Sequence, residues 1–168
     1  MIGNDVIDLQ QSRQESNWQR KGFTKKLFTA HEQLLIANDP DPETLVWVFW
    51  SMKEAAYKVY NRQTKIREYI PQKLVCNIIS KNNTTIIGQV ICSDNSYHTK
   101  TILSKENIHT IAVTSLKDLE HVIEIENKGI FKDENGIPHL LNSVSDTFQA
   151  VSISHHGRFE KVVTLNNS

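Results

Sequence analysis

The sequence lacks most of the features that would assign it to a special class of protein. It has only two cysteines, and its 19 basic residues are matched by 19 acidic ones. A balanced charge argues against a nucleic-acid-binding domain, which usually carries a basic excess. Cys76 and Cys92 lie in strand-like runs, which favours buried thiols in a reducing compartment over a disulfide framework. A hydrophobic content of 39% argues against disorder.

Neither a targeting signal nor a membrane span is evident. The start, Met-Ile-Gly-Asn-Asp, has no cationic residues followed by an apolar stretch, so it does not resemble a secretory signal. No apolar run approaches the roughly 20 residues that cross a bilayer. We therefore expect a cytoplasmic protein with no membrane or nucleic-acid partner, folded as a single domain over residues 1–168.

Hydrophobic patterning predicts helices early in the chain and strands late. Thr29 and Glu32 form a capping box before a helix over 30–38, which Asn-Asp-Pro-Asp-Pro then ends. The next helix opens with Leu-Val-Trp-Val-Phe-Trp from Leu45, apolar on every side and so buried all round. Strand-like runs at 73–79, 85–92, 97–103 and 108–114 predict an antiparallel meander, and two more strands flank a polar elbow at 155–158. The fold class is α+β, an antiparallel sheet packed against a long buried helix.

Three residues form a stripe along the long helix. Trp50, Glu54 and Lys58 recur at intervals of four residues, so they share one face. A carboxylate and an ammonium near a buried stretch need each other, a ligand or a metal, because unpaired burial is costly. An ordinary ion pair on a solvated face is the alternative, and the apolar lead-in argues against it. We place Lys53 on the surface and assign Tyr57 to packing.

A second candidate is Asp5, in a short strand predicted over residues 2–9. Its neighbours Ile2, Val6, Ile7 and Leu9 are apolar, and a carboxylate among them is expensive unless it is bound. A hard cation such as Mg²⁺ would satisfy it, together with waters and substrate phosphates. Taken alone, an aspartate that caps a turn at the strand end is the simpler interpretation.

The third candidate is Ser154-His155-His156-Gly157-Arg158. A hydroxyl, an imidazole, a flexible glycine and a guanidinium within five residues can bind phosphate oxygens. A catalytic Ser-His pair is the competing interpretation, but adjacent residues on a strand point in opposite directions. The remaining histidines lack metal-ligand spacing, so we treat them as structural or exposed.

Together and in this order, the motifs resemble the signatures of the 4′-phosphopantetheinyl transferases. The matching segments are Gly-Asn-Asp at 3–5, Phe-Thr-Ala-His-Glu at 28–32, Trp-Ser-Met-Lys-Glu-Ala-Ala-Tyr-Lys at 50–58 and Ser-Ile-Ser-His-His-Gly-Arg-Phe at 152–159. The tryptophan–lysine–glutamate–lysine block is the most specific of them. The chain is similar to a single half of that fold, of the short holo-acyl-carrier-protein-synthase type with features of the surfactin-synthetase-activating type.

The resemblance implies a reaction and roles for the residues. Coenzyme A would donate its 4′-phosphopantetheine arm to a serine of an apo carrier protein (acyl, polyketide or peptidyl), releasing 3′,5′-ADP, with Mg²⁺ on the pyrophosphate. Asp5 and Glu54 would hold the metal. Glu54 would also receive the serine proton, and Lys58 would offset charge on the transferring phosphate. The residues expected to contact coenzyme A are Lys58, Ser154, His155 and Arg158.

Two departures from the family pattern stand out. Some members carry a second acid two residues after the first aspartate, where this chain has Ile7, and Asp8 falls where the short type has its glutamate. The family helix usually runs into a glycine-containing turn after the last lysine, where this chain reads Val-Tyr-Asn-Arg at 59–62. A non-catalytic module that binds carrier protein or coenzyme A on the same fold is therefore the main alternative, and an unrelated structural α+β domain is a further one.

The single set of motifs also predicts an oligomer. In both family types the Ser-His motif meets the metal motif across a boundary between halves or subunits. With one half in the chain, another copy must supply the partner, and we expect a homotrimer in preference to a dimer. Residues around Val144 to Phe159 of one subunit should then approach Asp5 and Glu54 of its neighbour.

Overall fold

The computed structural model describes residues 1–142 and 147–166, apart from the side chain of Asn142. The elements in chain order are β1 (Ile2–Asp8), α1 (Leu9–Glu15), α2 (Phe23–Leu27), α3 (Ala30–Asn38), α4 (Pro42–Thr64), η1 (Pro71–Lys73), β2 (Leu74–Lys81), β3 (Thr85–Cys92), β4 (Asn95–Leu103), β5 (Asn107–Val113), η2 (Leu116–Glu120), β6 (Val122–Glu124), β7 (Ile130–Lys132), β8 (Pro138–Asn142), β9 (Thr147–His156) and β10 (Phe159–Leu165). No helix in this described part is long and apolar enough to cross a membrane.

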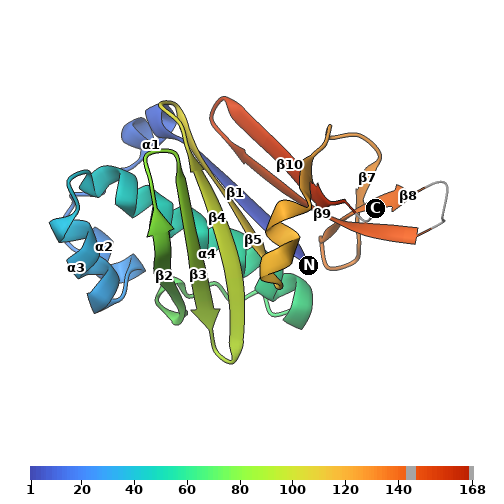
Figure 1. The fold of residues 1–168 in the computed structure, drawn as a ribbon, viewed down its shortest axis with the longest axis horizontal. Coiled ribbons are helices and arrows are strands. Elements are labelled where there is room, and N and C mark those ends of the chain that lie inside the picture. The colour runs from blue at the N-terminus through green and yellow to red at the C-terminus, as the bar shows by residue number, and fades with distance from the viewer. Residues whose placement is uncertain (143–146, 167–168) are drawn as a thin grey trace.

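A first antiparallel sheet has the strand order β1-β5-β4-β3-β2. Helix α4 packs against it, and α1 to α3 gather at one end of the pair (Figure 1). The core lies between α4 and the sheet and contains Val46, Phe49, Met52, Ile86 and Val90 among other buried residues. The α+β class and the meander over β2 to β5 are confirmed. The apolar start of α4, Leu45 to Phe49, is buried as predicted.

Helix α4 is longer than the sequence reading required. It begins with Pro42 in its first turn and with Asp41 as the N-cap, whose side chain accepts from the Thr44 N–H. It continues beyond Lys58 to Thr64 and ends where Lys65 adopts a left-handed conformation with φ of 60°. The glycine-containing turn of the family pattern is therefore replaced by helix after Lys58, and one more helical turn carries Arg62 into the interior.

Lys53 is a correction to the predicted surface position. Its side chain and that of Glu32 are both 0% exposed, and its Nζ lies 2.9 and 2.8 Å from the two carboxylate oxygens of Glu32. The carbonyls of Pro71 and Leu74 accept its other protons, and Glu32 also accepts the Cys76 N–H. Every charge in this buried pair is hydrogen-bonded, which is the condition for tolerating it inside a core. The capping box identified only the local role of Glu32.

A second sheet has the order β6-β10-β9-β8-β7 and lies on the far side of β1 (Figure 1). Its strand β9 joins β1 through side chains. Pairing with β5 leaves every second N–H of β1 free, and alternate side chains of β9 accept them. These contacts are Asn4 N to Ser152 Oγ at 2.8 Å, Val6 N to Ser154 Oγ at 2.9 Å and Asp8 N to His156 Nδ1 at 2.9 Å. The spacing Ser-x-Ser-x-His thus attaches the second sheet to the first.

Candidate functional site

A cavity of about 420 Å³ opens between β1, α4 and the end of β9, with α1 and α2 on its other sides. Two of its carboxylates come from the predicted metal pair, Asp5 on β1 and Glu54 on α4. Gly3 lets these elements approach closely, because a Cβ there would lie 2.2 Å from the carbonyl oxygen of Ala55. The remaining lining residues are Val6, Ile7, Ser12, Glu15, Ser16, Phe23, Leu27, Trp47, Trp50, His155 and His156.

The Asp5 carboxylate is only partly satisfied by the protein. Its Oδ1 accepts a hydrogen bond of 3.1 Å from the Ser154 hydroxyl, whereas its Oδ2 is buried without a partner among the described residues. Burial raises the pKa of Asp5, and the Lys58 ammonium and the Ser51 and Ser154 hydroxyls oppose that rise. A buried carboxylate oxygen without a donor is a position where a cation fits.

Glu54 faces the same cavity and interacts with Asp5. Burial and then the repulsion from Asp5 raise the pKa of Glu54 to about 7, while the Tyr69 hydroxyl and the Lys58 ammonium lower it. Two carboxylates that repel each other in a shared cavity suit a divalent cation. Residues 1–142 and 147–166 contain no cluster of three or more His, Cys, Asp or Glu side chains arranged to bind a metal. The assignment of Asp5 and Glu54 as ligands therefore stays a prediction.

Lys58 connects three elements at the rim of this site. Its Nζ donates to the carbonyl of Asn4 on β1 at 2.6 Å and to that of Ile153 on β9 at 3.0 Å. Burial lowers the pKa of Lys58, and the charges of Asp5 and Glu54 oppose the change. An ammonium has three donors, so one N–H is left for a ligand.

A second cavity of about 360 Å³ lies on the other side of His155. Among the described residues that line it, Lys58, Arg62 and Lys132 are basic and none carries a carboxylate. Arg62 is buried and donates through Nη2 to the carbonyls of Val151 at 2.6 Å and Pro138 at 3.1 Å, while its Nε has no partner in the described chain. The sequence reading missed Arg62, although it continues the stripe of Trp50, Glu54 and Lys58 at the same spacing of four.

Ser154 and His155 occupy different environments. Ser154 is buried, accepts from the Val6 N–H and donates to Asp5, so its hydroxyl has no proton left for a phosphate. His155 is exposed and lines both cavities, and its ring makes no hydrogen bond or ion pair with any other described residue. Of the two, His155 is the side chain free to contact a ligand.

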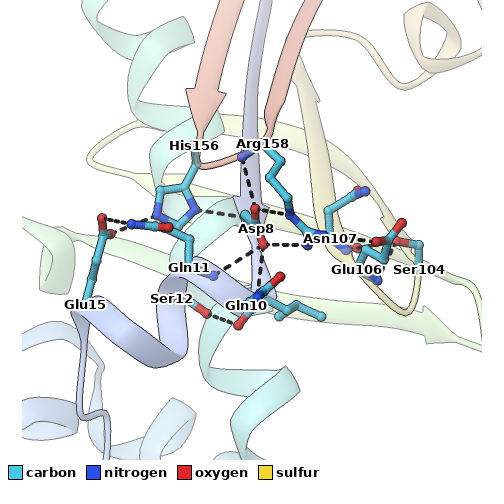
Figure 2. Close-up of polar contacts among 11 residues, drawn as sticks. Asp8, Gln10, Gln11, Ser12, Glu15, Ser104, Glu106, Asn107, His156 and Arg158 are labelled. Atoms are coloured by element: carbon cyan, nitrogen blue, oxygen red, sulfur yellow. Dashed lines mark hydrogen bonds and ion pairs between the residues drawn. The ribbon is translucent and has the colours of Figure 1, made fainter.

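Arg158 lines neither cavity. Its Nε and Nη2 donate to the two Asp8 carboxylate oxygens at 2.8 and 2.9 Å, and its Nη1 lies 3.1 Å from Glu106 (Figure 2). Gly157, with φ of +55°, turns the chain over Asp8, and a Cβ there would lie 2.6 Å from Asp8 Oδ2. Arg158 holds the pKa of Asp8 well below its usual range. The structure thus does not bring Arg158 to the other site residues.

The structure also corrects the expected subunit boundary. Ser154 and His155 meet Asp5 and Glu54 within one chain, because the second sheet packs on β1 of the same molecule. Of the segment predicted to approach a neighbour, Val144 lies outside the described residues. A second copy is therefore not needed to bring the Ser-His motif to Asp5 and Glu54, and the homotrimer stays a prediction.

Comparison with known proteins agrees with this geometry. A model of the 4′-phosphopantetheinyl transferase superfamily matches residues 1–114, about two thirds of the chain. The chain therefore belongs to the 4′-phosphopantetheinyl transferase superfamily. The match spans β1 to β5 and so includes Asp5, Glu54 and Lys58, whereas the second sheet with Ser154 and His155 lies beyond it. No curated protein matches the chain.

Proposed function

We propose that this protein transfers the 4′-phosphopantetheine arm of coenzyme A to a serine of an apo carrier protein, releasing 3′,5′-ADP, as a holo-acyl-carrier-protein synthase does. The observation that carries the proposal is the convergence of Asp5 and Glu54 on one cavity, next to a basic cavity on the other side of His155. Acyl, polyketide and peptidyl carriers all present such a serine, so the pathway could serve fatty acid, polyketide or peptide synthesis.

The residues present fit a magnesium ion. Asp5 Oδ2 is buried with no hydrogen-bond partner in the part of the chain that the structure describes, and Glu54 is close enough to Asp5 for the two charges to repel. Carboxylate oxygens are the ligands Mg²⁺ prefers, and it usually keeps waters or substrate phosphates as well. When bound, the ion would neutralise charge on the coenzyme A pyrophosphate. Asp5 and Glu54 would hold it, and Ser154 would keep the Asp5 carboxylate in place.

The second cavity fits the anionic end of coenzyme A. Counting contacts with residues 1–142 and 147–166, Lys58 has one N–H left and the buried Nε of Arg62 has no partner; Lys132 is exposed at the edge of the cavity. Guanidinium and ammonium groups bind phosphate oxygens through charge-assisted hydrogen bonds. His155 lines both cavities and would contact a phosphate lying between them. The predicted contacts of Ser154 and Arg158 with coenzyme A are weaker proposals, because both side chains already have partners.

The chemistry is a phosphoryl transfer. The serine oxygen of the carrier attacks the phosphorus that bears the pantetheine arm, the bond to the bridging pyrophosphate oxygen breaks, and 3′,5′-ADP leaves. The serine proton passes to the Glu54 carboxylate, which faces the same cavity. Lys58 offsets charge that develops on the phosphate. Positioning and charge neutralisation supply most of the acceleration in such reactions.

A mass measurement tests the proposal. Incubation of the protein with coenzyme A, Mg²⁺ and an apo carrier should add one phosphopantetheine group to the carrier serine. The Glu54→Ala variant should add none while keeping its fold. If no carrier of several types gains mass, the chain is instead a binding module for coenzyme A or carrier protein. Activity of Glu54→Ala equal to that of the wild type would contradict the metal assignment.

Two further points belong to the proposal. We propose that residues 1–168 act as one domain, since hydrogen bonds between β1 and β9 join the two sheets. We also retain the homotrimer, for which the family resemblance is the support. Sedimentation at working concentration distinguishes it from a monomer, which the intramolecular site allows.

A further inference from the structure

Tyr69 lies on the segment that connects α4 to η1. Because α4 runs on to Thr64 and ends at the left-handed Lys65, the chain returns alongside the helix before η1. The Asn61 side chain holds the start of this return by donating to the carbonyl of Ile66 at 2.8 Å. The lengthened helix therefore places a residue beyond its C-terminus back beside its middle turns.

The ring of Tyr69 is held against α4 by aromatic contacts with Trp50 and Tyr57, which flank Glu54 on that helix. Its centroid lies 5.9 Å from that of Trp50 at an interplanar angle of 88°, and 4.9 Å from that of Tyr57 at 65°. Both are edge-to-face arrangements, which aromatic pairs favour. Trp50 precedes Glu54 by four residues and Tyr57 follows it by three, so all three lie on neighbouring positions of one helix face. The three rings therefore lie beside the turn of α4 that carries Glu54.

The Tyr69 hydroxyl is buried and lacks an ordinary hydrogen-bond partner among the described residues. It makes no hydrogen bond of normal geometry with another described residue, yet it is close enough to Glu54 to lower the pKa of that carboxyl. A phenol hydroxyl has one proton to donate, and among the described residues this one gives it to no acceptor within ordinary hydrogen-bond geometry. Buried polar groups nearly always form a hydrogen bond, and Glu54 is the neighbouring acceptor.

We infer that Tyr69 is a positioning residue for Glu54, whose hydroxyl donates to one carboxylate oxygen and directs the other toward Asp5 and a divalent cation. The inference rests on the proposed function, because it takes Glu54 as a metal ligand. Ligating carboxylates are generally hydrogen-bonded in turn, and loss of such a partner lowers metal affinity or activity by about 10- to 100-fold.

Tyr69→Phe removes only the hydroxyl and keeps the ring contacts. The matched control is Tyr97→Phe, which removes another buried hydroxyl that lies against α4, where it donates to Gln63 at 2.7 Å. Binding of Mn²⁺ to the whole protein, without coenzyme A or carrier, is titrated by calorimetry. Tyr69→Phe should lower the affinity for Mn²⁺ at least about tenfold. Tyr97→Phe should bind Mn²⁺ with the affinity of the wild type.

Melting with and without Mn²⁺ provides a second readout that does not depend on the basal stability of the variant. Mn²⁺ should raise the melting temperature of Tyr69→Phe less than that of the wild type. Equal Mn²⁺ affinity in Tyr69→Phe and wild type overturns the inference, as does absence of Mn²⁺ binding to the wild type. Weakened binding in a protein that modifies no carrier supports the role of Tyr69 and contradicts only the transferase proposal.

Discussion

The Ser154 hydroxyl donates to Asp5 Oδ1 at 3.1 Å, although the two residues are 149 positions apart. The Ser154 Oγ also accepts the main-chain N–H of Val6 at 2.9 Å. One side chain therefore attaches β9 to β1 and orients the Asp5 carboxylate. The second sheet is therefore part of the candidate site and does more than cover it. Ser152, two residues earlier, accepts the Asn4 N–H in the same way but bonds to no carboxylate of the described residues.

This pair of serines gives a matched test. Ser154→Ala should lower both metal affinity and transfer rate, because Asp5 loses the donor that holds it. Ser152→Ala should leave both close to wild type. Each change leaves a buried N–H unsatisfied, so each should lower the free energy of unfolding by about 1–3 kcal/mol. Equal transfer rates in the two variants, measured by carrier mass at a temperature where both are folded, would contradict the role given to Ser154.

Glu54→Gln should reduce transfer at least about hundredfold, since removal of a general base typically costs that much or more. The neutral amide also removes one of the two charges that attract the cation. Glu15→Gln is the control, because Glu15 lines the same cavity but accepts hydrogen bonds from Gln11 and pairs with His156. Single-turnover carrier modification measures both variants. A comparable loss in Glu15→Gln would show that cavity charge in general, and not Glu54, is responsible.

Lys132→Ala should raise the KM for coenzyme A by up to about fivefold, the range expected for an exposed ion pair. Lys132 lines the basic cavity but is exposed, so its loss should leave folding and the metal affinity unchanged. Lys128→Ala changes a nearby lysine that pairs with Glu126 outside the cavity. The KM for coenzyme A should stay at the wild-type value in that control, and the effect of Lys132→Ala should shrink at high salt.

Lys53→Met should lower the free energy of unfolding by about 3–5 kcal/mol, because Glu32 would keep an uncompensated charge in the core. Lys81→Met breaks the partly exposed pair with Asp39 and should change stability by no more than about 1 kcal/mol. Urea denaturation of both variants measures the difference. Similar values for the two would mean that the buried pair contributes no more than a surface pair.

His109 should make stability depend on pH. It is buried beside Asn4, whose Nδ2 lies 3.2 Å from its Nε2, and burial lowers its pKa to about 4. As pH falls from about 6.5 to 4, the unfolded chain takes up the proton first, so the folded state loses roughly 3 kcal/mol over that window.

The His109→Gln variant isolates this contribution. The unfolding free energies of wild type and variant, measured by urea titration at several pH values, should converge or cross as the pH falls through that window. Parallel curves between pH 6.5 and 4 would contradict the titration assigned to His109. Other groups, including Glu54, contribute equally to both proteins and cancel in the difference.

Most of the secondary structure was predictable because its signals are local. The capping box of Thr29 and Glu32 marks the start of α3, as predicted, because its two hydrogen bonds close within one turn. The alternating strands β2 to β5 follow one another through short turns, so the order of pairing follows the order of the chain. The i+4 stripe is a local signal too: Trp50 and Glu54 line the first cavity and Lys58 lines the second.

Long-range packing decided the rest. Lys53 pairs with Glu32, 21 residues away, and Arg158 binds Asp8. The second sheet of the same chain lies where a neighbouring subunit was expected, and Tyr69 packs against Trp50 of α4. None of these contacts leaves a period or a turn signal in the amino-acid order. Each depends on which buried surfaces meet, and the free energy of burial is set by those surfaces together and not by any one segment.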